Sequence, residues 1–197
     1  MKILAFSDLH LARNRAAAIV EASAKADIVI GAGDFCNHRQ GLDQAIEMLA
    51  GIRCPFVAVP GNAESADELR AAAGPDIDVL HGQSVHVDGL EIYGIGYGIP
   101  VTPFGSWSCD MTETQAETML KQCRHADIIV SHSPPKGVAD QTSAGMSVGS
   151  TALRDAIVRL SPKYVFCGHI HDSWGQGGTI GRSKVHNLGP TVNWFEG

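Results

Sequence analysis

The chain has 197 residues, of which 44% are hydrophobic and 18% are charged, and this length and composition predict one globular domain, 1–197, and exclude a disordered chain. Its formal net charge is −6, from 15 basic and 21 acidic residues, so no basic groove for long nucleic acid is expected, because such binding depends on phosphate neutralisation by Lys and Arg. A small anionic ligand held by metal ions is compatible with this charge, since bound ions add positive charge that the sequence does not count.

The five cysteines are odd in number and include no Cys-x-x-Cys pair, which indicates reduced thiols and neither a disulfide framework nor a thiolate zinc site. The apolar start of the chain, Ile3 to Phe6, is too short for a signal-peptide core. No run approaches the ~18 apolar residues of a membrane-spanning helix. We therefore expect a cytoplasmic protein that does not associate with a membrane. No periodic apolar surface stands out that would indicate an oligomer.

The first half of the chain alternates short apolar runs with stretches of helical periodicity. The expected strands are 2–7, 27–31 and 55–59, and the expected helices are 12–26, 41–50 and 64–73. The third helix stops at Gly74-Pro75, which is a clear end signal. Such an alternation predicts a parallel sheet covered by helices.

The second half has a different pattern. Strands 84–87 and 90–93 flank Asp88-Gly89, which is a strong two-residue hairpin turn. A loop rich in Gly and Pro follows at 94–105. Helices are expected at 112–124, where Thr112 is a candidate cap, and at 148–160. The remaining expected strands are 127–130, 164–167, 174–180, 183–188 and 191–195. The whole pattern predicts one mixed α/β domain.

Five expected strands are each followed at once by side chains that can bind a metal ion. Sites in α/β sheets form outside the carboxyl ends of strands, so these five segments could meet in one cleft. In an extended chain, residues i and i+2 point to the same side, so Asp8 with His10 and His169 with His171 would each present two ligands together. The candidate ligands are Asp8, His10, Asp34, Asn62, His132, His169 and His171.

These candidates supply four imidazoles, two carboxylates and one amide. Mixed nitrogen and oxygen donors suit Mn, Fe, Zn, Co or Ni better than Ca or Mg, which favour oxygen shells. Seven ligands exceed the needs of one tetrahedral ion but suit two divalent ions if one carboxylate bridges them. A pair of ions ~3.5–4 Å apart lowers the pKa of a bound water and clamps the oxygens of an in-line displacement.

The ordered motifs Asp8-x-His10, Gly33-Asp34, Gly61-Asn62, His132 and Gly168-His169-x-His171 resemble those of the calcineurin-like metallophosphoesterase family. Three segments are most similar to small prokaryotic phosphoesterases related to cyclic-nucleotide phosphodiesterases. They are His132-Ser133-Pro134-Pro135, Gly168-His169-Ile170-His171 and Asn187-Leu188-Gly189-Pro190. The resemblance implies an α/β fold of two packed mixed β-sheets flanked by helices, in four layers α-β-β-α. It also implies a metal-dependent phosphoric ester hydrolase with a small phosphate-ester substrate.

The resemblance further implies how the ligands divide. One ion would take Asp8, His10 and His171, the other would take Asn62, His132 and His169, and Asp34 would bridge them. A metal-bridging hydroxide would attack phosphorus, and Asn62 would act with the cations as a catalytic group that stabilises the developing charge. Manganese is the expected metal, with Fe, Zn, Ni and Co as alternatives.

One position departs from the family pattern. The family carries a histidine after Gly-Asn that assists the reaction, and this chain has Ala63 there. General acid assistance contributes roughly 10²–10⁴-fold, so its loss should slow poor leaving groups most. We therefore expect a phosphodiesterase in preference to a monoesterase. A spare histidine could substitute from another loop, and the candidates are His38, His81 and His86.

Two other functions compete with this interpretation. A non-catalytic binding or scaffold protein could share the fold, although it would have no reason to keep all seven ligands. A serine hydrolase is suggested by Gly145-x-Ser147-x-Gly149, but that motif needs a strand immediately before the serine, and 139–144 is loop-like. We expect Ser147 or Ser150 to cap the following helix instead.

Four further residues near these motifs have open roles. Tyr97, Phe104 and Trp107 could stack on a base, although aromatic residues in such a loop more often anchor it to the core. Glu64 could orient the site through hydrogen bonds, or it could only begin the next helix.

Overall fold

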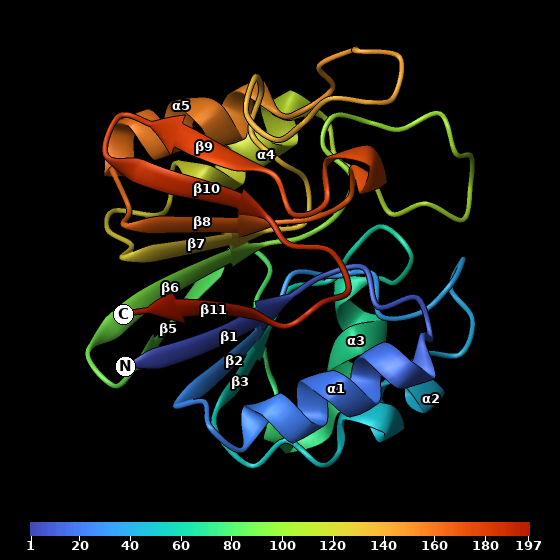
Figure 1. Ribbon diagram of the computed structural model, residues 1–197. Helices are drawn as coiled ribbons and strands as arrows, with labels where there is room; N and C mark the ends of the chain where they lie inside the picture. Colours follow the sequence, from blue (N-terminus) through green and yellow to red (C-terminus); the bar gives the residue numbers. More distant parts are fainter.

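The computed structural model describes residues 1–197 and contains two mixed β-sheets that pack face to face. Helices cover both outer faces, so the layers run α-β-β-α as predicted (Figure 1). The helices over the first sheet are α1 (Arg13–Ser23), α2 (Leu42–Leu49) and α3 (Ala66–Ala73). Those over the second sheet are α4 (Glu113–Leu120) and α5 (Thr151–Leu160).

The first sheet has the strand order β11-β1-β2-β3-β4. Four of its strands are parallel, as the alternating pattern of the first half predicted: β1 (Lys2–Phe6), β2 (Ile28–Gly31), β3 (Phe56–Ala58) and β4 (Asp78–Val79). The last strand of the chain, β11 (Asn193–Glu196), returns to pair antiparallel with β1. The beginning and end of the chain therefore lie side by side in this sheet (Figure 1).

The second sheet has the order β5-β6-β7-β8-β10-β9. Its four central strands are parallel: β6 (Leu90–Ile95), β7 (Ile128–Ser131), β8 (Tyr164–Cys167) and β10 (Ser183–Asn187). The antiparallel edge strands are β5 (Gln83–Val87) and β9 (Gly177–Ile180). Two short 3₁₀ turns, η1 (Gly74–Asp76) and η2 (His171–Ser173), follow α3 and β8.

Three apolar cores hold these four layers together. Alternate residues of β1 show the arrangement, since Ile3 and Ala5 point into the core between the sheets while Leu4 and Phe6 point into the core under α1, α2 and α3. The third core lies between the second sheet and the helices α4 and α5. None of the helices has the length and apolar content that a membrane crossing requires.

Local turn and cap signals in the sequence agree with the structure. Asp88 and Gly89 both have positive φ angles, 47° and 90°, which is the geometry of the predicted hairpin turn. Thr112 caps α4 through a reciprocal capping box with Gln115. Ser150, one of the two serines considered for this role, caps α5 by accepting a hydrogen bond from the Leu153 amide.

Some expectations about elements need correction. The strand expected at 174–180 begins only at Gly177, because residues before it form η2 and Trp174 turns toward Asp8. The two-residue strand β4 was not predicted, since its register with β3 depends on tertiary contacts. The parallel strands of both sheets all point their carboxyl ends to the same side of the molecule, where the connecting loops gather (Figure 1).

Candidate metal centre

The structure brings all seven predicted ligands together at the carboxyl ends of five strands. Four follow strands of the first sheet, and three follow β7 and β8 of the second sheet. Each of these residues contacts the next, so that together they form a ring around the cleft. The last contact of the ring is the hydrogen bond that the His169 backbone amide donates to Asp8. In order around the ring the residues are Asp8, His171, His10, Asp34, His132, Asn62 and His169.

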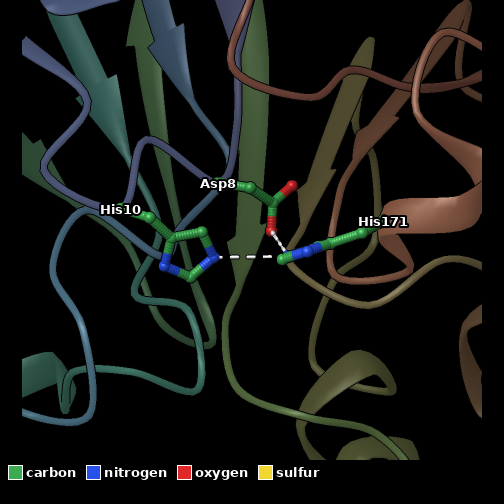
Figure 2. Close-up of side chains that lie close together, drawn as sticks. All are labelled: Asp8, His10 and His171. Carbon is green, nitrogen blue, oxygen red and sulfur yellow. Dashed lines mark hydrogen bonds and ion pairs between the residues drawn. The ribbon is translucent and has the colours of Figure 1, made fainter.

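One group of three donors faces a common point between the sheets. The Nε2 atom of His171 lies 3.6 Å from the Asp8 Oδ1 atom and 3.3 Å from the His10 Nε2 atom (Figure 2). Asp8 is buried, while His10 is part-exposed and His171 is exposed. Three donor atoms within 4.8 Å of one another are an arrangement that one metal ion could link.

The carboxylate of Asp34 faces donors on two sides. Its Oδ2 atom lies 3.5 Å from the His10 Nε2 atom, and its Oδ1 atom lies 3.4 Å from the His132 Nε2 atom. Asp8, Asp34 and His132 also form a buried group of donors within 4.8 Å. A carboxylate that presents one oxygen to each of two imidazoles has the geometry of a bridging ligand.

The side-chain amide of Asn62 lies between the imidazoles of His132 and His169. Its Oδ1 atom lies 3.1 Å from the His132 Nε2 atom and 3.0 Å from the His169 Nδ1 atom. The Asn62 Nδ2 atom donates to the Ser108 hydroxyl at 3.0 Å, and Ser108 in turn donates to Asp110 at 2.8 Å. This relay fixes the amide with its oxygen toward the histidines.

Backbone carbonyls set the orientation of two of the imidazoles. The Nδ1 atom of His10 lies 3.0 Å from the Cys36 carbonyl oxygen, and the Nδ1 atom of His132 lies 2.8 Å from the Ala32 carbonyl oxygen. A carbonyl oxygen only accepts, so each Nδ1 carries a proton, and Nε2 is the nitrogen of each ring that would bind a metal ion. Metal-ligating histidines are usually held in this way, so the donor set fits a divalent cation.

Asp8 has two supporting residues that sequence reasoning missed. The Trp174 indole Nε1 donates to the Asp8 Oδ2 atom at 3.0 Å, and the Ser7 hydroxyl donates to the same oxygen. The backbone amide of His169 donates to Asp8 Oδ1 at 3.1 Å. No spacing in the sequence indicates the Trp174 contact, because it joins two sheets across 166 positions.

Glu64 orients the site, which was one of its two considered roles. Its side chain is fully buried and accepts hydrogen bonds from the backbone amides of Asp34 at 2.8 Å and Gly61 at 2.7 Å. The Cys36 amide donates to its second oxygen. Burial and the charge of Asp34 raise the pKa of Glu64 to about 7. The helix begins later, at Ala66, with Ser65 as its cap.

The backbone at the site adopts conformations that most residues avoid. The φ angles are positive at four of the seven candidate ligands, with values between 46° at His10 and 66° at His169. Side chains seldom tolerate this left-handed region, and such residues cluster at functional sites. The neighbouring Gly168 is also required, because a Cβ atom there would clash with the Asp8 Oδ2 atom.

Histidines provide the only ion-pair partners of the Asp8 and Asp34 carboxylates. Burial disfavours the Asp8 anion, but His171, His132 and Ser7 outweigh it and hold its pKa well below the usual value. Burial likewise disfavours charge on His132, but Asp34 and Asp8 outweigh it and raise the pKa of the imidazole. Burial lowers the pKa of His169 to about 3, with a contribution from His132, so His169 is neutral, as a metal ligand must be.

The spare histidines lie in different places. His38 lines the same cavity of about 420 Å³ as Asn62 and Ala63. His81 packs against Tyr97 and accepts a hydrogen bond from the Gly96 amide. His86 lies on β5, where it is exposed beside Glu91 of the neighbouring strand β6. A larger hollow of about 940 Å³, against α1 and β11, contains none of the clustered donors.

The nucleophile elbow of a serine hydrolase does not form. The segment before Ser147 is a loop, and the Ser147 hydroxyl donates to the Asp140 carboxylate and not to a histidine. A serine hydrolase would also need a histidine beside Ser147, and His186, one of the histidines that follow it in the chain, lies in β10 next to Phe195 and Tyr164. The motif Gly145-x-Ser147-x-Gly149 is therefore a loop sequence without the required geometry.

Comparison with known proteins identifies the family of the chain. The family described as calcineurin-like phosphoesterase matches residues 1–173, and the chain belongs to this family. The family is one of metal-dependent phosphoesterases, and it implies a dinuclear centre of divalent metal ions. The metal-capable groups described above lie within the matched residues.

Two curated relatives from Caenorhabditis elegans are similar over parts of the chain. The UPF0046 protein T07D4.2 is 30% identical over 93 residues, which cover 44% of this chain and 23% of that protein. The UPF0046 protein K07C11.7 is 25% identical over 170 residues, which cover 76% of this chain and 58% of that protein. The chain thus spans less than two thirds of the length of either relative.

Solved structures share the fold at low sequence identity. The protein TT1561 of Thermus thermophilus has a TM-score of 0.76 at 16% identity, over 98% of this chain and 97% of that one. A dimetal phosphatase from Danio rerio has a TM-score of 0.61 at 12% identity, over 96% and 88% of the two chains. These likenesses confirm the predicted fold of two sheets flanked by helices.

Proposed function

We propose that this protein is a two-metal phosphodiesterase that hydrolyses a small phosphate ester, with manganese as the preferred ion. The observation that carries the proposal is the position of Asp34, whose two carboxylate oxygens face His10 at 3.5 Å and His132 at 3.4 Å. A carboxylate shared between two groups of histidines is what a dinuclear centre requires. The cytoplasmic location expected from the sequence is part of the same proposal.

The proposed ligand division is the one that the family resemblance implies. One ion would be held by Asp8, His10 and His171, the other by Asn62, His132 and His169, and Asp34 would be shared. The buried group of Asp8, Asp34 and His132 also falls within 4.8 Å, so Asp8 lies between the two positions. We assign it to the first ion because its Oδ1 atom is paired with His171.

When bound, the two ions would activate water as the nucleophile and neutralise charge on the phosphoryl oxygens. The chain's own contribution is preorganisation. Ser108 and Asp110 hold the Asn62 amide in one orientation, and Glu64 ties the Asp34 and Asn62 loops together through backbone amides. Groups fixed before the reaction need no reorganisation during it, which is the main source of electrostatic stabilisation in enzymes.

Ala63 supports a preference for diesters. This residue lies in the cavity wall beside Asn62, and its backbone amide donates to Asp34 Oδ1 at 2.8 Å. Its methyl group cannot donate a proton to a departing oxygen. Substrates with good leaving groups, such as aryl diesters, depend least on such a proton and should be cleaved best.

The proposal is tested with metal-stripped protein, assayed on a bis-aryl phosphate and on the matching aryl monoester before and after addition of Mn²⁺. We expect Mn²⁺ to restore diester cleavage well above monoester cleavage. The variant Asp34→Asn should bind fewer than two ions, measured by metal analysis, and should lose activity at least ~100-fold, because the bridging carboxylate is lost. Equal cleavage of both esters would reject the diesterase assignment.

The alternative of a binding or scaffold protein has one observation in its favour, which is the absence of an imidazole at Ala63. The same experiment separates it from the enzyme. A protein that binds two ions per chain and cleaves neither ester would match the scaffold function, while turnover that depends on Asp34 would exclude it.

A further inference from the structure

The first sheet ends at β11, and this edge of the sheet is open to pairing. No other strand of the chain pairs with the free side of β11. The Gly197 amide donates to the Met1 carbonyl oxygen at 2.8 Å, and the register with β1 continues without a bulge. Hydrogen-bonded and non-hydrogen-bonded pairs alternate along an antiparallel ladder, so Trp194 and Glu196 direct their backbone N–H and C=O groups away from β1. Such outward groups are a template for a further strand.

Two lysine side chains, one beside β8 and one on β10, lie next to this edge. The Lys163 Nζ atom and the Tyr164 hydroxyl donate to the Glu196 carbonyl oxygen at 2.9 and 3.2 Å, in agreement with its outward direction. The Nζ atoms of Lys163 and Lys184 lie 5.3 and 5.9 Å from the centroid of the Tyr164 ring. Neither ammonium group forms an ion pair with a carboxylate of the chain. An acidic group from another molecule would therefore be attracted to both.

The two sheets do not end at the same place. The hollow of about 940 Å³ at the edge of β11 has α1 as one wall and strands β8 and β10 of the second sheet as the other (Figure 1). Phe195 of β11 packs on Phe166 of β8 and on His186 of β10, with ring centroids 4.5 and 4.7 Å apart. The second sheet continues from there to β9, whereas the first sheet stops. A strand added to β11 would lie over this overhang and give both sheets six strands.

The strand β11 lacks the usual protection of a sheet edge. Natural edge strands are commonly shielded from pairing by a lysine, a proline or a bulge within the strand. The four residues of β11, Asn-Trp-Phe-Glu, include neither residue type, and the register has no bulge. Trp194 is 45% exposed and lines the hollow. An open backbone edge beside an exposed tryptophan is typical of a site that binds a partner, because tryptophan is enriched among residues that dominate binding energy.

The walls of the hollow limit what can occupy it. A two-fold contact between two copies of β11 would place identical walls opposite each other, so that α1 and the second sheet of one copy would meet those of the other. A single extended segment needs only the spacing of one strand, about 4.8 Å. Lys163 and Lys184 favour acidic side chains on its face toward the second sheet. The α1 wall carries one acidic and one basic side chain and presents the small side chains of Ala18 and Ala22, so apolar side chains fit there beside Trp194.

We propose that the free edge of β11 binds an extended, acidic segment of a partner protein, which adds a sixth strand to the first sheet. Main-chain hydrogen bonds to Trp194 and Glu196 supply affinity, and alternate side chains of the segment supply specificity. Its acidic side chains contact Lys163 and Lys184, and the side chains between them contact Trp194 and α1. The hollow contains none of the candidate metal ligands, so this inference does not depend on the proposed function.

The probe is a fluorescein-labelled heptapeptide in which Val and Glu alternate, and its Kd is measured by fluorescence anisotropy. When extended, this peptide presents Glu on one face and Val on the other. We expect Lys184→Glu to weaken binding about 10-fold, because it replaces an attraction with a repulsion. Lys121→Glu is the matched control, since it makes the same charge change at the exposed end of α4, outside the hollow. It should leave the Kd unchanged.

Two variants at Trp194 separate main-chain pairing from contact with the indole ring. Trp194→Ala and Trp194→Pro both remove the ring, but only the proline removes the N–H group that points away from β1. Proline is tolerated on an edge strand at such a position. We expect the proline variant to bind the peptide about 5-fold more weakly than the alanine variant, through the loss of one hydrogen bond. Lys184→Glu changes only an exposed side chain, so it keeps the proposal testable if the proline variant does not fold.

Several results would overturn the proposal. They are no binding of the peptide by the unaltered protein, the same Kd for Lys184→Glu and Lys121→Glu, and the same Kd for a folded Trp194→Pro variant and Trp194→Ala. Dimerisation of the unaltered protein that Trp194→Pro abolishes, measured by sedimentation, would assign the edge to a second copy and overturn it as well. A protein that binds the peptide as expected but cleaves neither aryl ester would keep this inference and reject the proposed function alone.

Discussion

At the scale of single residues, Ala63 is the position where this chain departs from its family. This residue is buried between Asn62 and Glu64 in the chain and lines the cavity beside Asn62. An imidazole placed there by Ala63→His would supply a proton to the leaving oxygen, and monoesters with poor leaving groups would gain most. We expect their kcat/KM to rise about 100-fold relative to the diester, measured by steady-state kinetics with Mn²⁺.

The control for this change is Ala63→Leu, which adds similar bulk without a proton donor. If the leucine variant gained monoester activity to the same extent, the effect would come from reshaping of the cavity and not from acid assistance. A histidine variant with an unchanged ratio of the two activities would mean that Ala63 does not set the preference.

Glu64 shows how a residue outside the ligand ring can control it. The variant Glu64→Gln retains one acceptor oxygen, but its amide group would face the backbone N–H groups of Asp34, Gly61 or Cys36. We expect Mn²⁺ affinity to fall about 10–100-fold, as for other residues that orient metal ligands. Metal titration by calorimetry measures this loss, and Glu21→Gln, on the exposed face of α1, should leave affinity unchanged.

The clustering of the seven candidate ligands could be predicted from the sequence, because each follows a strand end that carries its own local pattern. It did not predict Trp174 or Ser7 as partners of Asp8, since those contacts arise only when the two sheets pack. It also left the role of Glu64 open, because a glutamate before a helix has the same local pattern whether it caps the helix or turns inward. Only tertiary structure separates these alternatives.

At the scale of elements, α3 is tied to the loop after β2 by one ion pair. Glu68 completes the capping box with Ser65 and accepts two hydrogen bonds of 2.7 Å from the Arg39 guanidinium. The hydrogen bond from Arg39 lowers the pKa of Glu68 from 4.5 to about 2. Since the folded pKa is depressed, the stabilisation is complete above pH 4.5 and is lost as pH falls toward 2.

Glu68→Gln keeps the capping oxygen and removes the charge. At neutral pH it should lower the free energy of unfolding by about 1 kcal/mol or less, because both side chains are partly exposed to solvent. The difference in the free energy of unfolding between the variant and the unaltered protein should shrink as the pH falls from 4.5 to about 2. Urea unfolding at several pH values measures this difference. A difference that stayed constant over this range would show that the ion pair is not the source.

Elements with strong local signals were predictable, and elements defined by distant partners were not. The hairpin between β5 and β6 follows from Asp88-Gly89, and the start of α4 follows from Thr112 and Gln115. By contrast, β4 has only two residues, and its pairing with β3 exists only because α3 returns the chain to that edge. The loop after β6 was predicted two residues too early, because Gly94 packs within the strand against Leu80.

At the scale of the whole molecule, the core between the two sheets fixes how the candidate ligands of the first sheet lie against those of the second. Phe166 on β8 is fully buried there and packs on Phe195 of β11 with ring centroids 4.5 Å apart. Phe166→Ala should lower the free energy of unfolding by about 3–5 kcal/mol, through lost burial and a residual cavity. Urea unfolding measures this change.

Val158→Ala is the matched comparison, since Val158 is 62% exposed on α5 and its removal leaves no cavity. Its effect should stay within about 0.5 kcal/mol. A comparable loss in both variants would mean that the core between the sheets contributes no more than the surface.

The division of the ligands between the two sheets has a kinetic consequence. Asp34 belongs to the first sheet, and it faces His10 from that sheet and His132 from the second, while Asp8 and His10 meet His171 from the second. Neither sheet alone assembles either group, so the proposed ions would be captured only after the sheets have docked. Capture at that stage would slow unfolding without accelerating folding. The apolar cores would then determine how fast the native molecule forms, and the proposed ions would determine how long it lasts.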